Sequence, residues 1–237
     1  MKVAVVVPTY NEKGNIEFLV DRLMSLEITD LKVIVVDDNS PDGTGKVADE
    51  LAGKYKKRLK VIHRIRKMGL GNAYKAGFRK AFKMKIEGVI TMDADLSHDP
   101  KEILVMIKKF ENSQVVIGSR HIKKGKIKGL SFWRLGLSSG AQWLCQKLAG
   151  IRVKDATSGF RGYQVEALRK IYPQNIKSEG YSFLIEAIYR AQKLGLTIKE
   201  IPIVYQARNQ GNSKVSRMEI FKAVLTVFRL GKENLID

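Results

Sequence analysis

The feature that most constrains the fold of this chain is the alternation of short apolar runs with amphipathic segments through its first half. The apolar runs are rich in Val and Ile and have the length of buried strands. We predict strands at residues 2–7, 32–36, 59–63, 89–92 and 114–117. The segments between them carry apolar residues at helical spacing. We predict helices at residues 14–26, 44–55, 69–84 and 99–110.

Strands that alternate with helices at this spacing form βαβ units with right-handed crossovers around a parallel sheet. The predicted fold class is therefore α/β, with a mostly parallel sheet flanked by helices. The alternation ends after Ile117, and residues 155–162 have an irregular pattern. Beyond that point we predict helices at 131–148, 181–194 and 216–230 and a strand at 197–205. Because no Pro/Ser-rich linker interrupts the chain, we expect one continuous domain over 1–237.

The composition is that of a globular protein, with 44% hydrophobic and 8% aromatic residues. No apolar run approaches the ~18–20 residues that span a bilayer. The apolar run at 3–7 is too short for a signal peptide and has the pattern of a first strand. The single cysteine, Cys145, excludes an internal disulfide and a cysteine metal cluster. These features favour a reducing, cytosolic compartment.

The formal charge of +19 predicts attraction to polyanions, which include nucleic acid, nucleotide phosphates and anionic membrane surfaces. The charge is concentrated in two blocks without acidic residues, at 54–67 and 120–134. We interpret the first block as a solvated face. The second block is interrupted by glycines and by Phe132-Trp133, which is typical of a loop.

Two carboxylates, Asp93 and Asp95, follow directly after the apolar run that ends at Met92. Ligands of open α/β sheets collect outside the carboxyl ends of the strands, where this pair would lie. The two acids would repel each other unless a cation or a hydrogen-bond donor shared the site. A hard cation held by carboxylates and substrate phosphates fits that need. The alternative is that both are strand-end and turn residues without a ligand.

The segment Gly69-Leu-Gly71 imitates a dinucleotide-binding fingerprint, since it lies between a predicted strand and a predicted helix. The sixth position is Tyr74 instead of glycine, and the motif is not in the first βα turn. A tight turn with close helix packing is therefore the better interpretation. A nicotinamide-dependent oxidoreductase is the less favoured alternative.

The last predicted helix, 216–230, is apolar on most of its surface, and its polar residues fall on one narrow stripe. The stripe consists of Glu219, Lys222, Thr226 and Arg229. So wide an apolar face either packs on the domain or lies against a membrane or a partner's helix. We expect core packing here, and we expect Phe132-Trp133, beside lysines, to be the better candidate for contact with a membrane surface.

The strand-end motifs are specific in combination. The first four are Val-Pro-Thr-Tyr-Asn-Glu at 7–12, Val-Asp-Asp-Asn-Ser-Pro-Asp-Gly-Thr at 36–44, Gly-Leu-Gly-Asn-Ala at 69–73 and Met-Asp-Ala-Asp-Leu-Ser-His at 92–98. The later ones are Gly-Ser-Arg at 118–120, Trp-Arg at 133–134, Ser-Ser-Gly-Ala at 138–141, Ser-Gly-Phe-Arg at 158–161 and Arg-Asn-Gln-Gly-Asn-Ser-Lys at 208–214. Over nearly its whole length the chain resembles family-2 glycosyltransferases of GT-A fold, and in particular the dolichol-phosphate mannose synthases.

The resemblance implies a Rossmann-like sheet with a nucleotide-binding half over about 1–95. An acceptor half over about 96–237 would end in the C-terminal amphipathic helix. The implied contacts to the donor nucleotide sugar are Pro8, Tyr10, Glu12, Val36, Asp38, Asp93, Ala94, Asp95, Arg120, Arg208 and Lys214. The implied contacts to the acceptor phosphate are Arg120, Arg134 and Ser138, and the implied catalytic residues are Asp93, Asp95 and Arg120.

The resemblance also implies that Asp93 and Asp95 hold Mg²⁺ or Mn²⁺ on the donor diphosphate. Ser97 lies where some members have glutamine, so either its side chain or a water would be the third ligand. The implied reaction transfers mannose from GDP-mannose to dolichyl or polyprenyl phosphate, with inversion at the anomeric carbon. The implied location is peripheral, on the cytoplasmic face of a membrane, with a small membrane-protein subunit as a further partner and without nucleic acid.

Two alternatives stay open at this point. A lipid-phosphate glucosyltransferase that uses UDP-glucose shares the implied chemistry, and the neighbourhood of Asp38 does not distinguish guanine from uracil. A basic nucleic-acid-binding domain would account for the charge. It would leave the paired acids Asp93 and Asp95 unexplained, because without metal they would repel phosphate.

Overall fold

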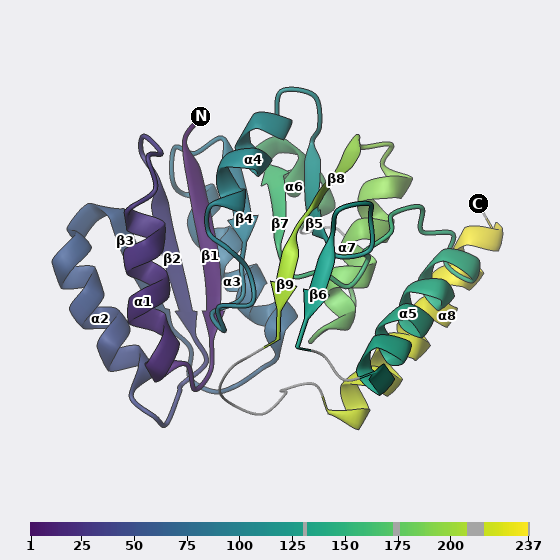
Figure 1. The fold of residues 1–237 in the computed structure, drawn as a ribbon, viewed down its shortest axis with the longest axis horizontal. Coiled ribbons are helices and arrows are strands. Elements are labelled where there is room, and N and C mark those ends of the chain that lie inside the picture. The colour runs from purple at the N-terminus through teal and green to yellow at the C-terminus, as the bar shows by residue number, and fades with distance from the viewer. Residues whose placement is uncertain (130–131, 173–175, 208–215, 237) are drawn as a thin grey trace.

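A computed structural model describes residues 1–129, 132–172, 176–207 and 216–236 (Figure 1). Seven strands form one sheet in the order β3-β2-β1-β4-β7-β5-β8. Their bounds are β1 Val3–Thr9, β2 Lys32–Asp37, β3 Leu59–His63, β4 Gly88–Thr91, β5 Val115–Ser119, β7 Arg161–Gln164 and β8 Ile198–Pro202. Neighbours pair in parallel except at β7, which is antiparallel to both β4 and β5. The predicted α/β class with a mostly parallel sheet is confirmed.

Helices cover both faces of the sheet because alternate strand residues point to opposite sides. In β1, Val3, Val5 and Val7 join one apolar cluster, while Ala4 and Val6 join the other. The first cluster is covered by α1 (Lys13–Met24), α2 (Thr44–Tyr55) and α4 (Glu102–Lys109). The second is covered by α3 (Leu70–Phe82), α6 (Val165–Ile171) and α7 (Ser182–Lys193). A 3-10 turn, η1 (Lys56–Arg58), precedes β3.

Two elements of the second half, strand β7 and helix α6, lie where no strand or helix was predicted. The strand has only four residues, and its Arg161 is fully buried with its guanidinium donating to the carbonyls of Ala156 and Leu184. A charged residue at a buried strand position removes the apolar pattern on which the prediction depended.

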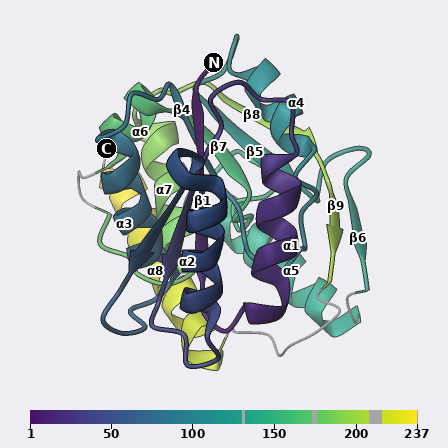
Figure 2. The same ribbon diagram turned by 90° about the vertical axis from the view of Figure 1, so that its left-hand side faces the viewer.

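The strand predicted at 197–205 divides at Ile203 into β8 and a separate strand, β9 (Val204–Gln206). Strand β9 pairs in parallel with β6 (Lys126–Lys128), inside the second basic block. Figure 2 shows this two-stranded ribbon on the opposite side of the molecule from α3. The second basic block therefore includes a short strand beside the main sheet.

The two longest helices of the described residues, α5 (Phe132–Lys147) and α8 (Arg217–Ile236), pack side by side at the edge of the molecule beyond β8 (Figure 1). The expectation that the apolar face of the last helix packs on the domain is confirmed only for part of that face, where Val227 and Leu230 are buried in the core and Ala223 packs against it. It is wrong for the rest. The exposed fractions of five apolar side chains lie between 41% and 60%. These side chains, which we call the apolar stripe, are Met218, Ile220, Phe221, Leu225 and Phe228.

The side of α8 that faces the domain carries polar residues as well as the buried Val227 and Leu230. The hydroxyls of Thr226 and Ser178 lie 3.3 Å apart, and Arg229 donates to Glu186 of α7 at 2.7 Å. Glu186 is fully buried and is also paired with Arg190 at 3.2 Å. A buried carboxylate needs such partners, so Thr226 and Arg229 are turned inward, whereas Lys222 of the same stripe is exposed. The sequence of the helix shows how wide its apolar face is. It does not show which side of the helix packs on the domain, because that depends on polar partners elsewhere in the chain.

Within the described ranges, no helix has both the length and the apolar character that crossing a bilayer requires.

Candidate active site

The carboxyl ends of β1, β2 and β4 meet at one edge of the sheet, and a cavity of about 120 Å³ lies there. Six of the residues that the resemblance implied for the donor line this cavity. They are Pro8, Tyr10, Glu12, Asp38, Asp93 and Ala94. The sequence therefore identified much of one wall, which the first half of the chain supplies.

Asp38 follows β2 and is 7% exposed on the cavity wall. Arg64 donates to its Oδ1 at 2.5 Å, and the backbone N–H of Met68 donates to Oδ2 at 3.3 Å. Burial raises the pKa of the Asp38 carboxyl, and the neighbouring Arg64 guanidinium offsets part of that rise. Asp38 is thus a fixed acceptor, tied to the loop that follows β3.

The same loop also places a positively charged lysine side chain at the cavity. Lys67 lines it, and its Nζ lies 4.0 Å from the centroid of the Tyr10 ring, within the range of a cation–π contact. Lys67 is the last residue of the basic block interpreted from sequence as a solvated face. For Lys67 that interpretation is wrong, because its positive charge lies beside Tyr10, one of the predicted nucleotide contacts.

Asp93 and Asp95 follow β4, with Asp93 lining the cavity and Asp95 only 7% exposed. The Tyr74 hydroxyl donates to Asp93 Oδ1 at 3.3 Å, and the Ser97 N–H donates to Asp95 Oδ1 at 3.1 Å. A Cβ at Gly159 would lie 3.1 Å from Asp93 Oδ2, so the backbone of that loop approaches the carboxylate closely. The structure therefore brings both acids to the predicted strand end.

The same segment fits a divalent cation that a substrate would help to bind. Among the residues that the structure describes, no three His, Cys, Asp or Glu side chains gather into a metal cluster. The buried Ser97 Oγ and His98 Nδ1 have no hydrogen-bond partner, donor or acceptor, among the described residues. Two carboxylates and one spare hydroxyl are too few for a protein-only site, but they suit Mg²⁺ or Mn²⁺ that also binds substrate phosphates and water.

His98 itself is a packing residue. Its ring stacks on Phe160 at a centroid distance of 5.0 Å and meets Tyr205 edge-on at 5.7 Å. Burial lowers the pKa of His98 to about 4, so the imidazole is neutral at neutral pH. It therefore adds no positive charge beside Asp93 and Asp95.

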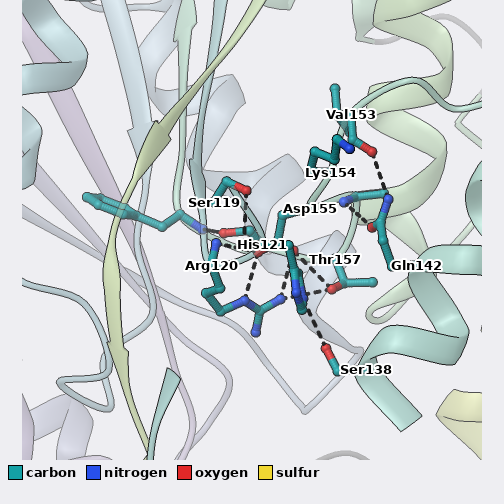
Figure 3. A network of polar contacts seen from close by, with 12 residues as sticks. Ser119, Arg120, His121, Ser138, Gln142, Val153, Lys154, Asp155 and Thr157 are labelled. Atoms are coloured by element: carbon teal, nitrogen blue, oxygen red, sulfur yellow. Dashed lines mark hydrogen bonds and ion pairs between the residues drawn. The ribbon is translucent and has the colours of Figure 1, made fainter. Parts of the chain in front are cut away.

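Arg120 lies outside the cavity, after the end of β5, in a network of its own (Figure 3). Its Nε donates to Asp155 Oδ2 and its Nη2 to Asp155 Oδ1, both at 2.8 Å. Nη2 also donates to Thr157 Oγ1 at 2.9 Å, and the guanidinium lies 5.2 Å from the centroid of the Tyr205 ring. Burial would raise the pKa of the Asp155 carboxyl, but its bonds from Arg120 outweigh that and hold the pKa below its ordinary value.

The loop that carries Asp155 is held from two sides. The Glu200 carboxylate of β8 accepts the backbone N–H groups of Lys154 and Asp155 at 2.8 and 3.1 Å. Gln142 of α5 donates to the Val153 carbonyl at 2.7 Å and accepts the N–H of Ala156 at 2.8 Å. Sequence reasoning missed Asp155, since its role depends on this long-range bonding and the local pattern carries no sign of it.

Ser138, one of the residues implied for the acceptor, lies on α5, and its Oγ is 3.4 Å from Nε2 of His121 (Figure 3). Because His121 follows Arg120 in the chain, this contact places Arg120 and Ser138 in the same region of the structure.

The remaining predicted site residues lie elsewhere. Val36 is buried in β2, paired with Pro8, and does not line the cavity. Arg208, Lys214 and the side chain of Arg134 lie outside the described residues.

The cavity also has lining residues from the second half of the chain that were not predicted. Gly180 and Tyr181 at the start of α7 and Glu219 of α8 line it, and the Tyr181 N–H donates to Glu219 at 2.9 Å. The glycines of the imitated fingerprint pack against this wall. A Cβ on Gly69 would be 3.2 Å from the Gly180 nitrogen, and one on Gly71 would be 2.7 Å from Phe183 Cβ. The interpretation as a tight turn with close helix packing is thus confirmed.

Known proteins place this architecture in a family. Residues 4–172 match the sequence profile of glycosyl transferase family 2. A polyprenol monophosphomannose synthase of Mycolicibacterium smegmatis is 37% identical over 98% of this chain and 88% of its own length. An undecaprenyl-phosphate mannosyltransferase of Micrococcus luteus is 36% identical over 98% of this chain and 94% of its own. A dolichol-phosphate mannosyltransferase of Pyrococcus furiosus is 36% identical over the whole chain and 66% of its own length.

Solved structures agree on the fold. Glucosyl-3-phosphoglycerate synthase from Mycobacterium tuberculosis, in complex with Mn²⁺, UDP and glucosyl-3-phosphoglycerate, superposes with a TM-score of 0.72 over 98% of this chain and 80% of that one. The sequence identity is 20%, so this likeness concerns the GT-A fold alone. The same enzyme with Mg²⁺ and UDP gives a TM-score of 0.68 at 18% identity, over 98% of this chain and 79% of that one. Sheet order, strand-end acids and full-length relatives agree, and the chain is a glycosyltransferase that belongs to glycosyl transferase family 2.

Proposed function

We propose that this protein transfers mannose from GDP-mannose to a polyprenyl or dolichyl phosphate. The observation that carries the proposal is the separation of two charged sites at one edge of the sheet. Asp93 lines the cavity and Asp95 follows two residues later, whereas Arg120 is not among the lining residues and lies in a network with Asp155. A reaction between two anionic substrates needs such a division. Relatives that are 36–37% identical over nearly the whole chain are named for this type of transfer.

The donor nucleotide would occupy the cavity, on the half of the chain over about 1–95. Asp38, whose carboxylate is fixed by Arg64, would accept from the N–H groups of the base edge, beside Val36 at the end of β2. Pro8, Tyr10, Glu12 and Ala94 would line the nucleotide, together with the newly found Lys67. Arg208 and Lys214, which lie outside the described residues, would neutralise the diphosphate.

Asp93 and Asp95 would hold Mg²⁺ or Mn²⁺, with Ser97 Oγ or a water as a further ligand. When bound, the ion would supply charge neutralisation for the departing diphosphate. Tyr74 fixes the orientation of Asp93 through its hydroxyl, and the Ser97 N–H does the same for Asp95. The chain's own contribution is therefore a pair of oriented carboxylates at the point where the leaving group gains charge.

The acceptor phosphate would bind to Arg120, Arg134 and Ser138, in the half over about 96–237. A phosphate monoester has a second pKa of ~6, so it is largely a dianion at neutral pH. Its oxygen can attack the anomeric carbon without a side chain that removes a proton. The new bond joins that oxygen to the anomeric carbon, the bond from this carbon to the diphosphate breaks, and the configuration inverts.

The apolar stripe on α8 supports a peripheral location at the cytoplasmic face of a membrane. Met218, Phe221, Leu225 and Phe228 recur at helical spacing and are exposed, with Lys222 exposed among them. Trp143 of the neighbouring α5 is 58% exposed. Amphipathic helices with apolar residues and lysines lie in the interface plane of anionic membranes, which is where a polyprenyl phosphate presents its head group. A small membrane-protein subunit could share the same face.

The UDP-glucose alternative is favoured by one observation, the resemblance in fold to an enzyme solved with UDP-glucose. Because that enzyme is only 20% identical to this chain, mannose transfer is the preferred function. Titration of the protein with GDP-mannose and with UDP-glucose in Mn²⁺ separates the two. If the protein binds UDP-glucose more tightly than GDP-mannose, the proposed donor is wrong and UDP-glucose takes its place.

The decisive experiment measures transfer of radiolabelled mannose from GDP-mannose to a polyprenyl phosphate, with and without EDTA. We expect transfer that EDTA abolishes and Mn²⁺ restores. Asp93→Asn and Asp95→Asn should each lower the rate by at least about 100-fold, because each removes a metal ligand. Asp99→Asn is the matched control, since Asp99 is exposed and pairs with Arg22 at 2.8 Å. Transfer that is insensitive to EDTA and to both substitutions would contradict the proposal.

A further inference from the structure

His121 lies between Arg120 and Ser138, two of the three residues that the proposed function assigns to the acceptor phosphate (Figure 3). It follows Arg120 directly in the chain, and its Nε2 lies 3.4 Å from Ser138 Oγ on α5 (Figure 3). The backbone around it is fixed, because Arg120 donates its own N–H to Asp155 at 3.0 Å and the His121 N–H points to Ser119 Oγ at 3.4 Å. The imidazole is therefore held at this place by the strand end and by the helix.

The guanidinium of Arg120 has one side left for a ligand. Its Nε and Nη2 donate to Asp155 and Thr157, and no described residue accepts a hydrogen bond from its Nη1. A phosphate that bound Nη1 of Arg120 and the hydroxyl of Ser138 at once would have to lie against the imidazole between them. In that position the side chain of His121 would offer a third donor.

We propose that His121 donates its Nε2–H to the acceptor phosphate, together with Arg120 and Ser138. This inference rests on the proposed function, and it names a residue that neither the sequence pattern nor the resemblance assigned. In the unliganded protein Nε2 and Ser138 Oγ face each other. When the phosphate arrives, both groups turn their protons to its oxygens, since a dianion accepts from several donors at once. No bond is made or broken by His121, so its effect is on acceptor binding.

The competing explanation is that His121 only positions Ser138. The two roles differ in what a second substitution does. If His121 acts only through Ser138, removing the imidazole adds nothing once the Ser138 hydroxyl is gone. If both donate to the phosphate, the double variant is weaker than either single variant, as expected for separate contacts.

The test compares His121→Phe, His121→Gln, Ser138→Ala and the double variant His121→Phe/Ser138→Ala in mannose transfer to a polyprenyl phosphate. His121→Phe should raise the acceptor KM about tenfold, the scale of one lost hydrogen bond to a charged group. The donor KM should stay within about twofold. His121→Gln should recover most of the acceptor affinity, because its amide keeps an N–H close to the Nε2 position. The double variant should have a higher acceptor KM than either single variant.

A matched control is His63→Phe, because His63 is half-exposed on β3 and pairs with Asp49, away from the predicted acceptor residues. It should change neither KM. Should His121→Phe lower the melting temperature, His121→Asn withdraws the Nε2 donor without added bulk and must give the same acceptor effect.

The inference fails if the wild-type protein transfers mannose and the His121 variants leave the acceptor KM unchanged. It also fails if they raise both KM values equally, or if the double variant equals Ser138→Ala. A wild-type protein that transfers no mannose would instead overturn the proposed function itself. The two failures are therefore distinguishable in one set of assays.

Discussion

Asp155 holds Arg120 through three hydrogen bonds, from the backbone N–H, from Nε and from Nη2 of the arginine, at 3.0, 2.8 and 2.8 Å. The carboxylate is fully buried, and the Arg120 side chain is 13% exposed. This bidentate pair fixes the guanidinium plane in a way that a single contact could not. Arg120 is therefore oriented before any substrate binds, and Asp155 is the residue that orients it.

Asp155→Asn should destabilise the protein and weaken acceptor binding together. The amide keeps the size of the carboxylate but leaves the Arg120 charge buried without a counter-charge, at a cost of about 3 kcal/mol in the free energy of unfolding. We also expect the acceptor KM to rise at least about tenfold, because the guanidinium loses its fixed orientation. Urea unfolding and steady-state kinetics measure the two effects.

The control for this substitution is Asp21→Asn, which removes an exposed ion pair with Lys54. An exposed pair contributes up to about 1 kcal/mol, so this change should be small. If Asp155→Asn is as mild as Asp21→Asn, the proposed positioning role of Asp155 is wrong.

The parts of the site that the sequence predicted are those in which one short segment carries the information. The strand-end acids Asp93 and Asp95 and the turn residues Tyr10 and Asp38 follow apolar runs directly, so their shared edge follows from the parallel topology. The predicted first-half strands and helices are present for the same reason. Each has its own apolar period, and no distant partner is needed to recognise it.

The parts that were missed depend on partners far away in the chain. Asp155 gains its role from Arg120, 35 residues earlier, and Glu219 reaches the cavity by contact with Tyr181, 38 residues earlier. The side of α8 that faces the domain depends on the buried acid Glu186, which lies on another helix. No local periodicity encodes such pairings, so a single sequence could not predict them.

Glu186 makes the packing of α8 on α7 dependent on pH. Burial would raise the pKa of this carboxyl, but hydrogen bonds from Arg229 and Ser178 outweigh that and hold the pKa below its ordinary value of 4.5. A lowered pKa in the folded state means that the unfolded state binds the proton first as pH falls. The stabilisation is therefore complete above pH 4.5 and is lost as pH falls through the folded-state pKa.

Glu186→Gln should accordingly lower the free energy of unfolding at neutral pH by about 3 kcal/mol, because Arg229 and Arg190 lose their buried counter-charge. Below pH 4.5 the difference between variant and wild type should shrink. Urea unfolding at a series of pH values measures both effects. A difference that stays constant down to about pH 3 would show that the Glu186 charge does not stabilise the fold.

The apolar stripe on α8 should determine vesicle binding. The double variant Phe221→Ser/Leu225→Ser removes two exposed apolar side chains of the stripe. We expect binding to anionic vesicles to weaken at least about tenfold, since each buried apolar side chain contributes ~1.5–3 kcal/mol. Vesicle sedimentation measures the loss, and the melting temperature should stay unchanged.

Phe18→Ser is the matched control for the stripe, because Phe18 is 56% exposed on α1, on the other face of the sheet. It should leave vesicle binding unaltered. Equal losses for Phe18→Ser and the stripe variant would show that general surface hydrophobicity, and not α8, drives the association.

Gly180 lines the cavity that we propose for the donor, and a substitution there tests whether its close contact with Glu219 shapes that cavity. Its φ is +60°, and a Cβ there would lie 2.1 Å from Glu219 Oε2. Gly180→Ala must therefore displace Glu219 as well as adopt a left-handed backbone, and we expect the donor KM to rise at least about fivefold while the acceptor KM stays unchanged.

Gly195→Ala is the matched control, since Gly195 has a φ of +67° and a Cβ added there would meet no atom of the described residues within 4 Å. It should cost ~1–2 kcal/mol in the free energy of unfolding and leave the donor KM unaltered. If both variants raise the donor KM equally, strain alone accounts for the effect, and the contact between Gly180 and Glu219 does not shape the donor cavity.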